Sequence, residues 1–266
     1  MESFFLSYLT SKIHVIHHGK GPELLICFHG FGESAKHFDV IAKGLGDVFT
    51  VVAIDLPLHG NTVWREERPL EKADVIDWIE KILAQFGQQT FSLMGYSMGG
   101  RVSLCVIEKL ATKVNRLILV APDGLKNNPW HMIATQTRWG NHIFKYNTYH
   151  PAFFFRLLTV LRKWHMINES VYKFVLYNMN NLAKRELVYK VWTCLRHMMP
   201  NRKHCKQLLA QRKIQTLLFF GKYDRVIPPI LGQKFADGTF PCKIVVLDKG
   251  HQLLSEELAL MVKQNL

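Results

Sequence analysis

The sequence predicts an α/β fold, in which helices cover both faces of a mostly parallel sheet and one helical segment is inserted. Three observations support this prediction. Six apolar runs of four to six residues lack the polar alternation of a half-solvated sheet, so each is expected to be buried on both faces. Stretches with helical spacing lie between most of these runs. One gap of more than 90 residues interrupts the alternation and is far too long for a connection within a sheet.

The apolar runs and the helical stretches give the order of the predicted elements. Apolar positions recur at intervals of three and four residues in 73–86 and in 98–110, which predicts a helix in each segment. A strand is expected at each short apolar run. These runs are residues 24–28, 49–54, 91–94, 117–120, 216–220 and 244–247.

The long gap predicts a helical cap. Aromatic and aliphatic side chains recur at helical intervals in residues 125–212, and this segment is expected to lie over the carboxyl edge of the sheet. Residues 1–124 and 213–266 are then the core domain. The apolar side chains on which the cap prediction depends include Phe154, Leu157, Leu158, Leu161 and Trp164.

The segment GYSMGG, centred on Ser97, has the pattern of a nucleophile elbow. A predicted strand precedes the serine and a predicted helix follows it, which is the context that this turn requires. Gly95 and Gly99 would relieve collisions between the tight turn and neighbouring backbone. We therefore expect a strained turn that exposes the Ser97 hydroxyl beside N–H groups at the start of a helix.

A serine nucleophile needs a base and an acid, and both follow in the sequence at the ends of predicted strands. Asp224 lies in GKYDRVIP just after the fifth predicted strand, and His251 lies in DKGHQL just after the sixth. Because the carboxyl ends of parallel strands meet at one edge of a sheet, Ser97, Asp224 and His251 are expected to form a catalytic triad. Asp123, in VAPDG, also follows a strand and is an alternative acid.

The segment FHGFGES, directly after the first predicted strand, is expected to supply an oxyanion hole. His29 and Gly30 would bend the chain sharply, so that the N–H of Phe31 can act together with that of Met98, the residue after the nucleophile. Two such N–H groups would stabilise the negative charge that develops on the substrate oxygen during acyl transfer.

With these motifs the chain resembles the α/β-hydrolase superfamily, in the branch with a serine nucleophile and a helical cap inserted after the sixth strand. The resemblance covers almost the whole sequence and implies the fold, an esterase-like activity and the site residues named above. In DLPLHG, Leu58 stands where the family commonly has glycine, so the shape of the loop near His59 is not implied; His59 is interpreted as a packing residue. The matching segments are HGFGES, DLPLHG, GYSMGG, GKYDRVIP and GHQL.

The predicted function is cleavage of a carboxylic ester or thioester through an acyl-enzyme, without a metal ion or cofactor. Ser97 would attack, His251 would act as base and then acid, and Asp224 would orient the imidazole. One alternative is a lyase, because GYSMGGR is similar to the elbow of the menaquinone-pathway synthase. That enzyme eliminates pyruvate from a cyclohexene carboxylate, and its arginine matching Arg101 helps to hold substrate carboxylates. Another alternative is a non-catalytic ligand-binding protein on the same fold.

The net charge of +13 is concentrated in the predicted cap. Residues 125–212 contain 15 lysines and arginines but only two acidic residues, whereas the rest of the chain is neutral. Three interpretations remain open: a solvated helix face, attraction of an anionic substrate, and peripheral contact with an anionic membrane. The segment HPAFFFRLLTVLRKW has the composition of an interfacial helix, and the same pattern could line an acyl pocket. No nucleic-acid motif accompanies the charge, so no nucleic-acid partner is expected.

The cysteines and the N-terminal segment predict a cytoplasmic protein. Five cysteines without C-x-x-C spacing favour neither a disulfide framework nor a zinc site. The segment MESFFLSYLTSK has no basic region and no cleavage site, so no signal peptide is expected. No apolar stretch reaches the roughly 18 residues that a membrane-spanning helix needs.

Overall fold

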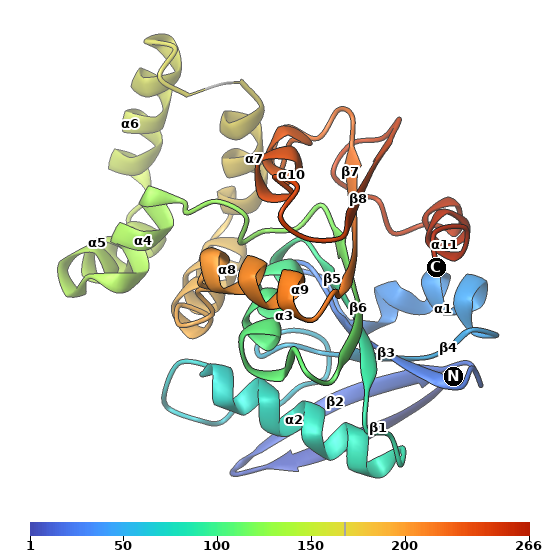
Figure 1. Ribbon diagram of the computed structural model, residues 1–266. Coiled ribbons are helices and arrows are strands. Elements are labelled where there is room, and N and C mark those ends of the chain that lie inside the picture. Colours follow the sequence, from blue (N-terminus) through green and yellow to red (C-terminus); the bar gives the residue numbers. More distant parts are fainter. Residues whose placement is uncertain (168) are drawn as a thin grey trace. The chain divides into compact units, whose positions relative to one another are not determined.

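The central sheet has eight strands in the order β1-β2-β4-β3-β5-β6-β7-β8 (Figure 1). The computed structural model describes residues 1–167 and 169–266. From β4 to β8 neighbouring strands pair parallel, whereas β1 and β2 run antiparallel to their neighbours. The predicted α/β fold with a mostly parallel sheet is confirmed. The strands are β1 (Glu2–Tyr8), β2 (Ser11–His18), β3 (Glu23–Phe28), β4 (Phe49–Ile54), β5 (Phe91–Tyr96), β6 (Val114–Val120), β7 (Gln215–Gly221) and β8 (Cys242–Leu247).

All six predicted strands are present, and the apolar runs in β3, β4, β5, β6 and β7 are buried as the pattern required, apart from the partly buried Thr50; the run in β8 is not. Every residue of β5 is buried, and so are the last four residues of β6. Strand β4 has its predicted bounds, and the other five extend beyond theirs by one to three residues. The extensions contain polar residues that still form ladder pairs, such as Arg116 opposite Gln215. Strand β8, at the edge of the sheet, is less covered, and only its last residue is buried.

Strands β1 and β2 are an antiparallel hairpin that the apolar-run criterion missed. In β1 most side chains are exposed, and only Leu6 is buried. In β2 the apolar residues are interrupted by histidines, among them the buried His14. A search for continuous apolar runs misses β1 because it is mostly exposed, and it misses β2 because a buried histidine lies among its apolar residues.

Helices cover both faces of the sheet (Figure 1). Helix α3 begins and ends where it was predicted, and α2 begins and ends one residue before its predicted bounds. On the other face, α1 packs against α11. The helices around the sheet are η1 (Ala35–Phe38), α1 (Asp39–Leu45), α2 (Lys72–Gln85), α3 (Met98–Leu110), α9 (Arg202–Gln211), α10 (Ile230–Phe235) and α11 (Glu256–Lys263).

The chain forms two compact units, Met1–Lys126 with His197–Leu266, and Asn127–Arg196. The second unit is helical and follows β6, but it is shorter than the predicted segment 125–212. The difference arises because α9 packs on α3, with Leu209 fully buried and the Cys205 thiol donating to the Leu104 carbonyl at 3.3 Å. The second unit contains α4 (Pro129–Gln136), α5 (Arg138–Tyr149), α6 (Ala152–Lys163), α7 (Glu169–Met179) and α8 (Leu182–Cys194).

The described helices also bear on the question of membrane insertion. None of them is both long enough and apolar enough to cross a bilayer. This finding agrees with the hydropathy of the sequence.

Leu58 occupies a backbone conformation that favours glycine. Its φ is +68°, and its side chain is partly exposed, so packing does little to compensate the steric cost. The turn therefore has the left-handed conformation that glycine adopts without strain, but a branched side chain stands at this position. The next residue, His59, is buried and holds part of the site described below.

Replacement of Leu58 by glycine is expected to stabilise the protein. Removing the Cβ relieves the left-handed strain, and we expect a gain of about 1 kcal/mol and a rise in Tm of about 2 °C. Leu58→Ala is the matched control, because it removes the same side chain but retains the Cβ. Equal melting temperatures for the glycine and alanine variants would contradict this account.

Candidate active site

Ser97 lies in a strained turn between β5 and α3. Its φ is +49° and its ψ is −116°, as the elbow pattern predicted. The turn is held from both sides, because the Ser97 N–H donates to the Val120 carbonyl at 2.9 Å and the Asp123 N–H donates to the Ser97 carbonyl at 2.8 Å. These bonds tie the serine to the end of the neighbouring strand β6, so the hydroxyl is fixed relative to the sheet.

The glycines beside Ser97 are required by close approach of neighbouring backbone. A Cβ on Gly95 would lie 2.6 Å from the Gly99 carbonyl oxygen and would also collide with the Ser103 hydroxyl. A Cβ on Gly99 would overlap the Phe28 carbonyl at the end of β3. The collisions expected from the sequence are therefore present, and they explain why no side chain is tolerated at either position.

Three side chains form a continuous hydrogen-bonded chain at the carboxyl edge of the sheet. The Ser97 hydroxyl donates to His251 Nε2 at 3.0 Å, and His251 Nδ1 donates to Asp224 Oδ2 at 2.7 Å. The other carboxylate oxygen of Asp224 accepts the N–H groups of Val226 at 2.8 Å and Ile227 at 2.9 Å. The Asp224 side chain has no solvent exposure. The structure thus brings together the three residues that the sequence singled out.

The alternative acid, Asp123, is engaged elsewhere. One of its carboxylate oxygens pairs with the Arg101 guanidinium, and the other accepts the Gly124 N–H at 2.7 Å. The same ion pair engages the guanidinium of Arg101, and the Arg101 side chain is only 12 % exposed. Among the described residues, the carboxylate bonded to His251 is that of Asp224.

Two N–H groups are candidates for the oxyanion hole. Met98 is the first residue of α3, where an N–H has no partner within the helix. In the described part of the chain neither the N–H of Met98 nor that of Phe31 meets an acceptor. The loop containing Phe31 lies against Ser97, since a Cβ on Gly30 would be 3.3 Å from the Ser97 Cβ and 3.2 Å from the Tyr96 ring.

Glu33 closes the turn that contains Phe31. Its Oε2 accepts the Gly30 N–H at 3.4 Å, and its N–H donates to the Gly30 carbonyl at 3.4 Å. Burial raises the pKa of the Glu33 carboxyl, while the nearby His37 and His251 act in the opposite direction. Glu33 lies within the segment FHGFGES but was not among the site residues predicted from the sequence.

Two buried neutral histidines hold the same loop. His29 Nε2 accepts the Leu56 N–H at 3.0 Å, and His59 Nε2 accepts the Gly32 N–H at 3.0 Å. In each ring the acceptor nitrogen must be unprotonated, so Nδ1 carries the proton and donates to a backbone carbonyl, that of Gly30 for His29. Burial, together with the neighbouring His59, lowers the pKa of His29 to about 3, and burial also lowers the pKa of His59. The interpretation of His59 as a packing residue is refined: it positions the loop.

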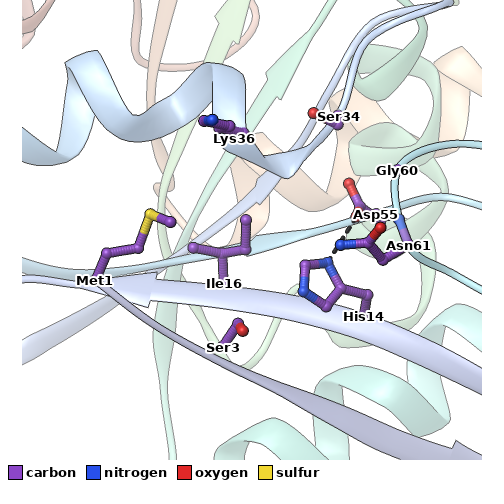
Figure 2. Close-up of a pocket in the computed structure, with 9 residues that line it drawn as sticks. All are labelled: Met1, Ser3, His14, Ile16, Ser34, Lys36, Asp55, Gly60 and Asn61. Atoms are coloured by element: carbon purple, nitrogen blue, oxygen red, sulfur yellow. Dashed lines mark hydrogen bonds and ion pairs between the residues drawn. The ribbon is translucent and has the colours of Figure 1, made fainter.

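Asp55 joins this loop to the N-terminal hairpin. Its carboxylate accepts hydrogen bonds from the backbone N–H groups of Ala35 at 2.6 Å and Asn61 at 2.9 Å. It also pairs with Nδ1 of the His14 ring at 2.7 Å. Asp55, His14 and Asn61 line a pocket of about 420 Å³ (Figure 2), whose other lining residues are Met1, Ser3, Ile16, Ser34, Lys36 and Gly60. None of the three triad side chains lines this pocket. Asp55 lies in the motif DLPLHG, but its three partners are dispersed in the sequence.

Comparison with known proteins agrees with this geometry. A sequence profile described as the α/β hydrolase fold matches residues 23–163, more than half of the chain. The chain belongs to the α/β-hydrolase family.

Individual relatives within the family are distant. An uncharacterized hydrolase of Bacillus subtilis, YugF, is 23 % identical over 257 residues, which is 91 % of both chains. A pimeloyl-[acyl-carrier protein] methyl ester esterase of Pseudoalteromonas atlantica is 31 % identical over 114 residues, 42 % of each chain. A thioesterase domain from the curacin biosynthetic pathway superimposes with a TM-score of 0.67 at 18 % identity, covering 99 % of both chains. The family and these names support a hydrolase of the esterase class.

The buried neutral state of His29 predicts acid sensitivity. Between pH 6.5 and 3 the unfolded chain binds a proton on this imidazole that the folded protein excludes, so stability falls as the pH drops through this window. At pH 5 we expect His29 to account for about 2 kcal/mol of the loss relative to pH 7.5.

The measurement is the free energy of unfolding of wild type and His29→Gln at several pH values. The glutamine oxygen can still accept the Leu56 N–H but does not titrate, so the variant is expected to show a shallower slope below pH 6.5. His204→Gln, at an exposed position on α9, is the control and should keep the wild-type slope. Parallel slopes for wild type and His29→Gln would show that the imidazole does not titrate between the two states.

Proposed function

We propose that the protein is a serine hydrolase that cleaves a carboxylic ester or thioester of a small molecule through an acyl-enzyme intermediate. The observation that supports this proposal most directly is the hydrogen-bonded chain from the Ser97 hydroxyl through His251 to the buried Asp224. A base within 3.0 Å of the nucleophile, itself oriented by a carboxylate, is the arrangement that activates a serine hydroxyl.

In the first half of the reaction, Ser97 Oγ attacks the substrate carbonyl carbon while His251 Nε2 takes the hydroxyl proton. The N–H groups of Phe31 and Met98 stabilise the oxyanion of the tetrahedral intermediate, a contribution of about 3 kcal/mol for one such donor in other enzymes. When the intermediate collapses, the bond to the leaving alcohol or thiol breaks and His251 returns the proton to it.

In the second half, water attacks the Ser97 acyl ester and gives its proton to His251. Collapse of the second intermediate releases the acid and returns the proton to Ser97 Oγ, so the enzyme is restored without a redox change. Asp224 keeps the proton of the neutral imidazole on Nδ1 and stabilises the imidazolium that forms in each half. Its two backbone bonds fix the carboxylate for this purpose.

The pairing of Arg101 with Asp123 favours hydrolysis over the lyase alternative. In the menaquinone-pathway synthase, which eliminates pyruvate, the arginine matching Arg101 helps to hold substrate carboxylates. Here its guanidinium is engaged with a carboxylate of the protein itself. A non-catalytic ligand-binding protein is disfavoured for a different reason, since such a protein has no need of a base hydrogen-bonded to a serine in a strained turn.

Ser97→Ala is expected to abolish ester hydrolysis and labelling by a fluorophosphonate. The nucleophile and the base act as a unit, so the loss of kcat should be on the order of 10⁶. The measurement is ester turnover together with gel detection of the covalent adduct. Ser103→Ala, which removes another hydroxyl of α3, is the control and should retain labelling. Persistent labelling of Ser97→Ala would place the nucleophile elsewhere.

Asp224→Asn is expected to lower kcat by about 10⁴, because an amide leaves the imidazole in the wrong tautomer. Asp123→Asn should have a much smaller effect on kcat, since that carboxylate pairs with Arg101. Steady-state kinetics of both variants on the same ester test the assignment. The opposite ranking would assign the acid to the end of β6.

A further inference from the structure

Helix α6 and the residue that ends it carry an exposed apolar row. Phe153 is 69 % exposed and Trp164 is 71 % exposed, and Leu157 and Val160 between them are also exposed. The spacing of four, three and four residues places these side chains on one face of the helix. On the opposite face Leu158 is buried. We call the four exposed side chains the α6 stripe.

The rest of the second unit has the same character. Of the 23 exposed large apolar side chains among the described residues, 13 lie within the 70 residues Asn127–Arg196. On α5, Trp139, Ile143 and Tyr146 form a second exposed row with helical spacing. Large exposed apolar patches generally mark surfaces that bind a partner, because their exposure to water is unfavourable.

Positive charge flanks the α6 stripe. Arg156 and Lys163 are both exposed on α6, and this helix contains no acidic residue. The whole unit has ten lysines and arginines but only two acidic residues, Glu169 and Glu186. Both acids are already paired, Glu169 with Arg162 at 2.8 Å and Glu186 with a lysine one turn along its own helix. The unit therefore presents a surface with a large excess of positive charge.

We propose that the α6 stripe docks on an anionic lipid surface. Apolar and aromatic side chains on one face of a helix, with arginine and lysine beside them, suit the boundary between acyl chains and negatively charged headgroups. Tryptophan at the end of the helix favours the same boundary, because its ring is apolar and its N–H is polar. Charge complementarity favours lipid over another copy of this chain, since a second unit of the same charge would be repelled.

Vesicle co-sedimentation of the full chain tests the proposal. The protein should bind vesicles of phosphatidylcholine with phosphatidylserine at least about tenfold more tightly than vesicles of phosphatidylcholine alone. Binding should weaken as the ionic strength rises from about 0.1 to 1 M, when the screening length falls from about 10 to 3 Å. Brominated lipids should quench tryptophan fluorescence, and this quenching should decrease in Trp164→Phe.

Two variants separate the apolar and the ionic contributions. A triple variant, Phe153→Ser, Leu157→Ser and Trp164→Ser, removes most of the stripe, and Arg156→Glu with Lys163→Glu reverses the flanking charge. Each is expected to weaken binding to anionic vesicles at least about tenfold.

The matched control changes the same amount of charge in the other unit, with Lys203→Glu on the exposed surface of α9 and Arg212→Glu at the exposed residue directly after it, and should bind as wild type. Thermal melting verifies that each protein is folded. The charge variant tests the proposal on its own if the triple variant does not fold.

Several outcomes would overturn the proposal. These are failure of the wild type to bind anionic vesicles, equal binding by wild type and the charge variant, and a loss of binding in the control as large as in the charge variant. A dimer that the stripe substitutions convert to a monomer would identify the stripe as a protein interface. Salt-sensitive turnover of a soluble anionic ester, without vesicle binding, would assign the charge to substrate attraction. Vesicle binding does not depend on Ser97, so Ser97→Ala should bind as wild type.

Discussion

The geometry of the site depends on one constraint, the left-handed backbone at Ser97. This conformation is unfavourable for serine, and it persists because the turn is bonded to the end of β6 and packed against the end of β3. The glycines at positions 95 and 99 allow that close packing, so the hydroxyl projects toward His251 and α3 begins immediately behind it. The same turn therefore fixes both the Ser97 hydroxyl and the N–H of Met98, the first residue of α3, whereas His251 reaches the hydroxyl from the loop after β8.

The second half of the site is held by imidazoles that stay neutral. His29 and His59 each accept a hydrogen bond from one backbone N–H and donate one to a backbone carbonyl. These bonds connect the loop around Phe31 to the loop after β4. Asp55 extends this connection to His14 in the hairpin. In the proposed reaction this loop supplies a backbone donor to a developing negative charge, and such ties help because preorganised donors need no rearrangement.

The residues tied to strand ends were the most predictable part of the site. Fold rules place the ends of parallel strands at one edge, so His251 and two candidate acids, Asp224 and Asp123, could be identified from the sequence alone. The choice between Asp224 and Asp123 could not, because it depends on the side-chain pairing with Arg101. The β1–β2 hairpin and the end of the inserted unit were missed for a similar reason. The mostly exposed strand β1 and the mostly polar helix α9 lack a clear apolar pattern. Their places in the fold depend on particular contacts, such as that of Cys205 in α9.

The position of β8 gives the two ends of the hydrogen bond between Ser97 and His251 unequal stability. Ser97 follows β5, an interior strand whose residues are all buried, whereas His251 follows β8, an edge strand with one neighbour and little cover. Edge elements open more readily than interior ones, since fewer contacts must break. Detachment of β8 would separate the imidazole from the serine while the rest of the sheet remained intact. We therefore expect mild denaturing conditions to separate His251 from Ser97 first at this edge of the sheet, and the hydrogen bond between them to return once β8 re-forms.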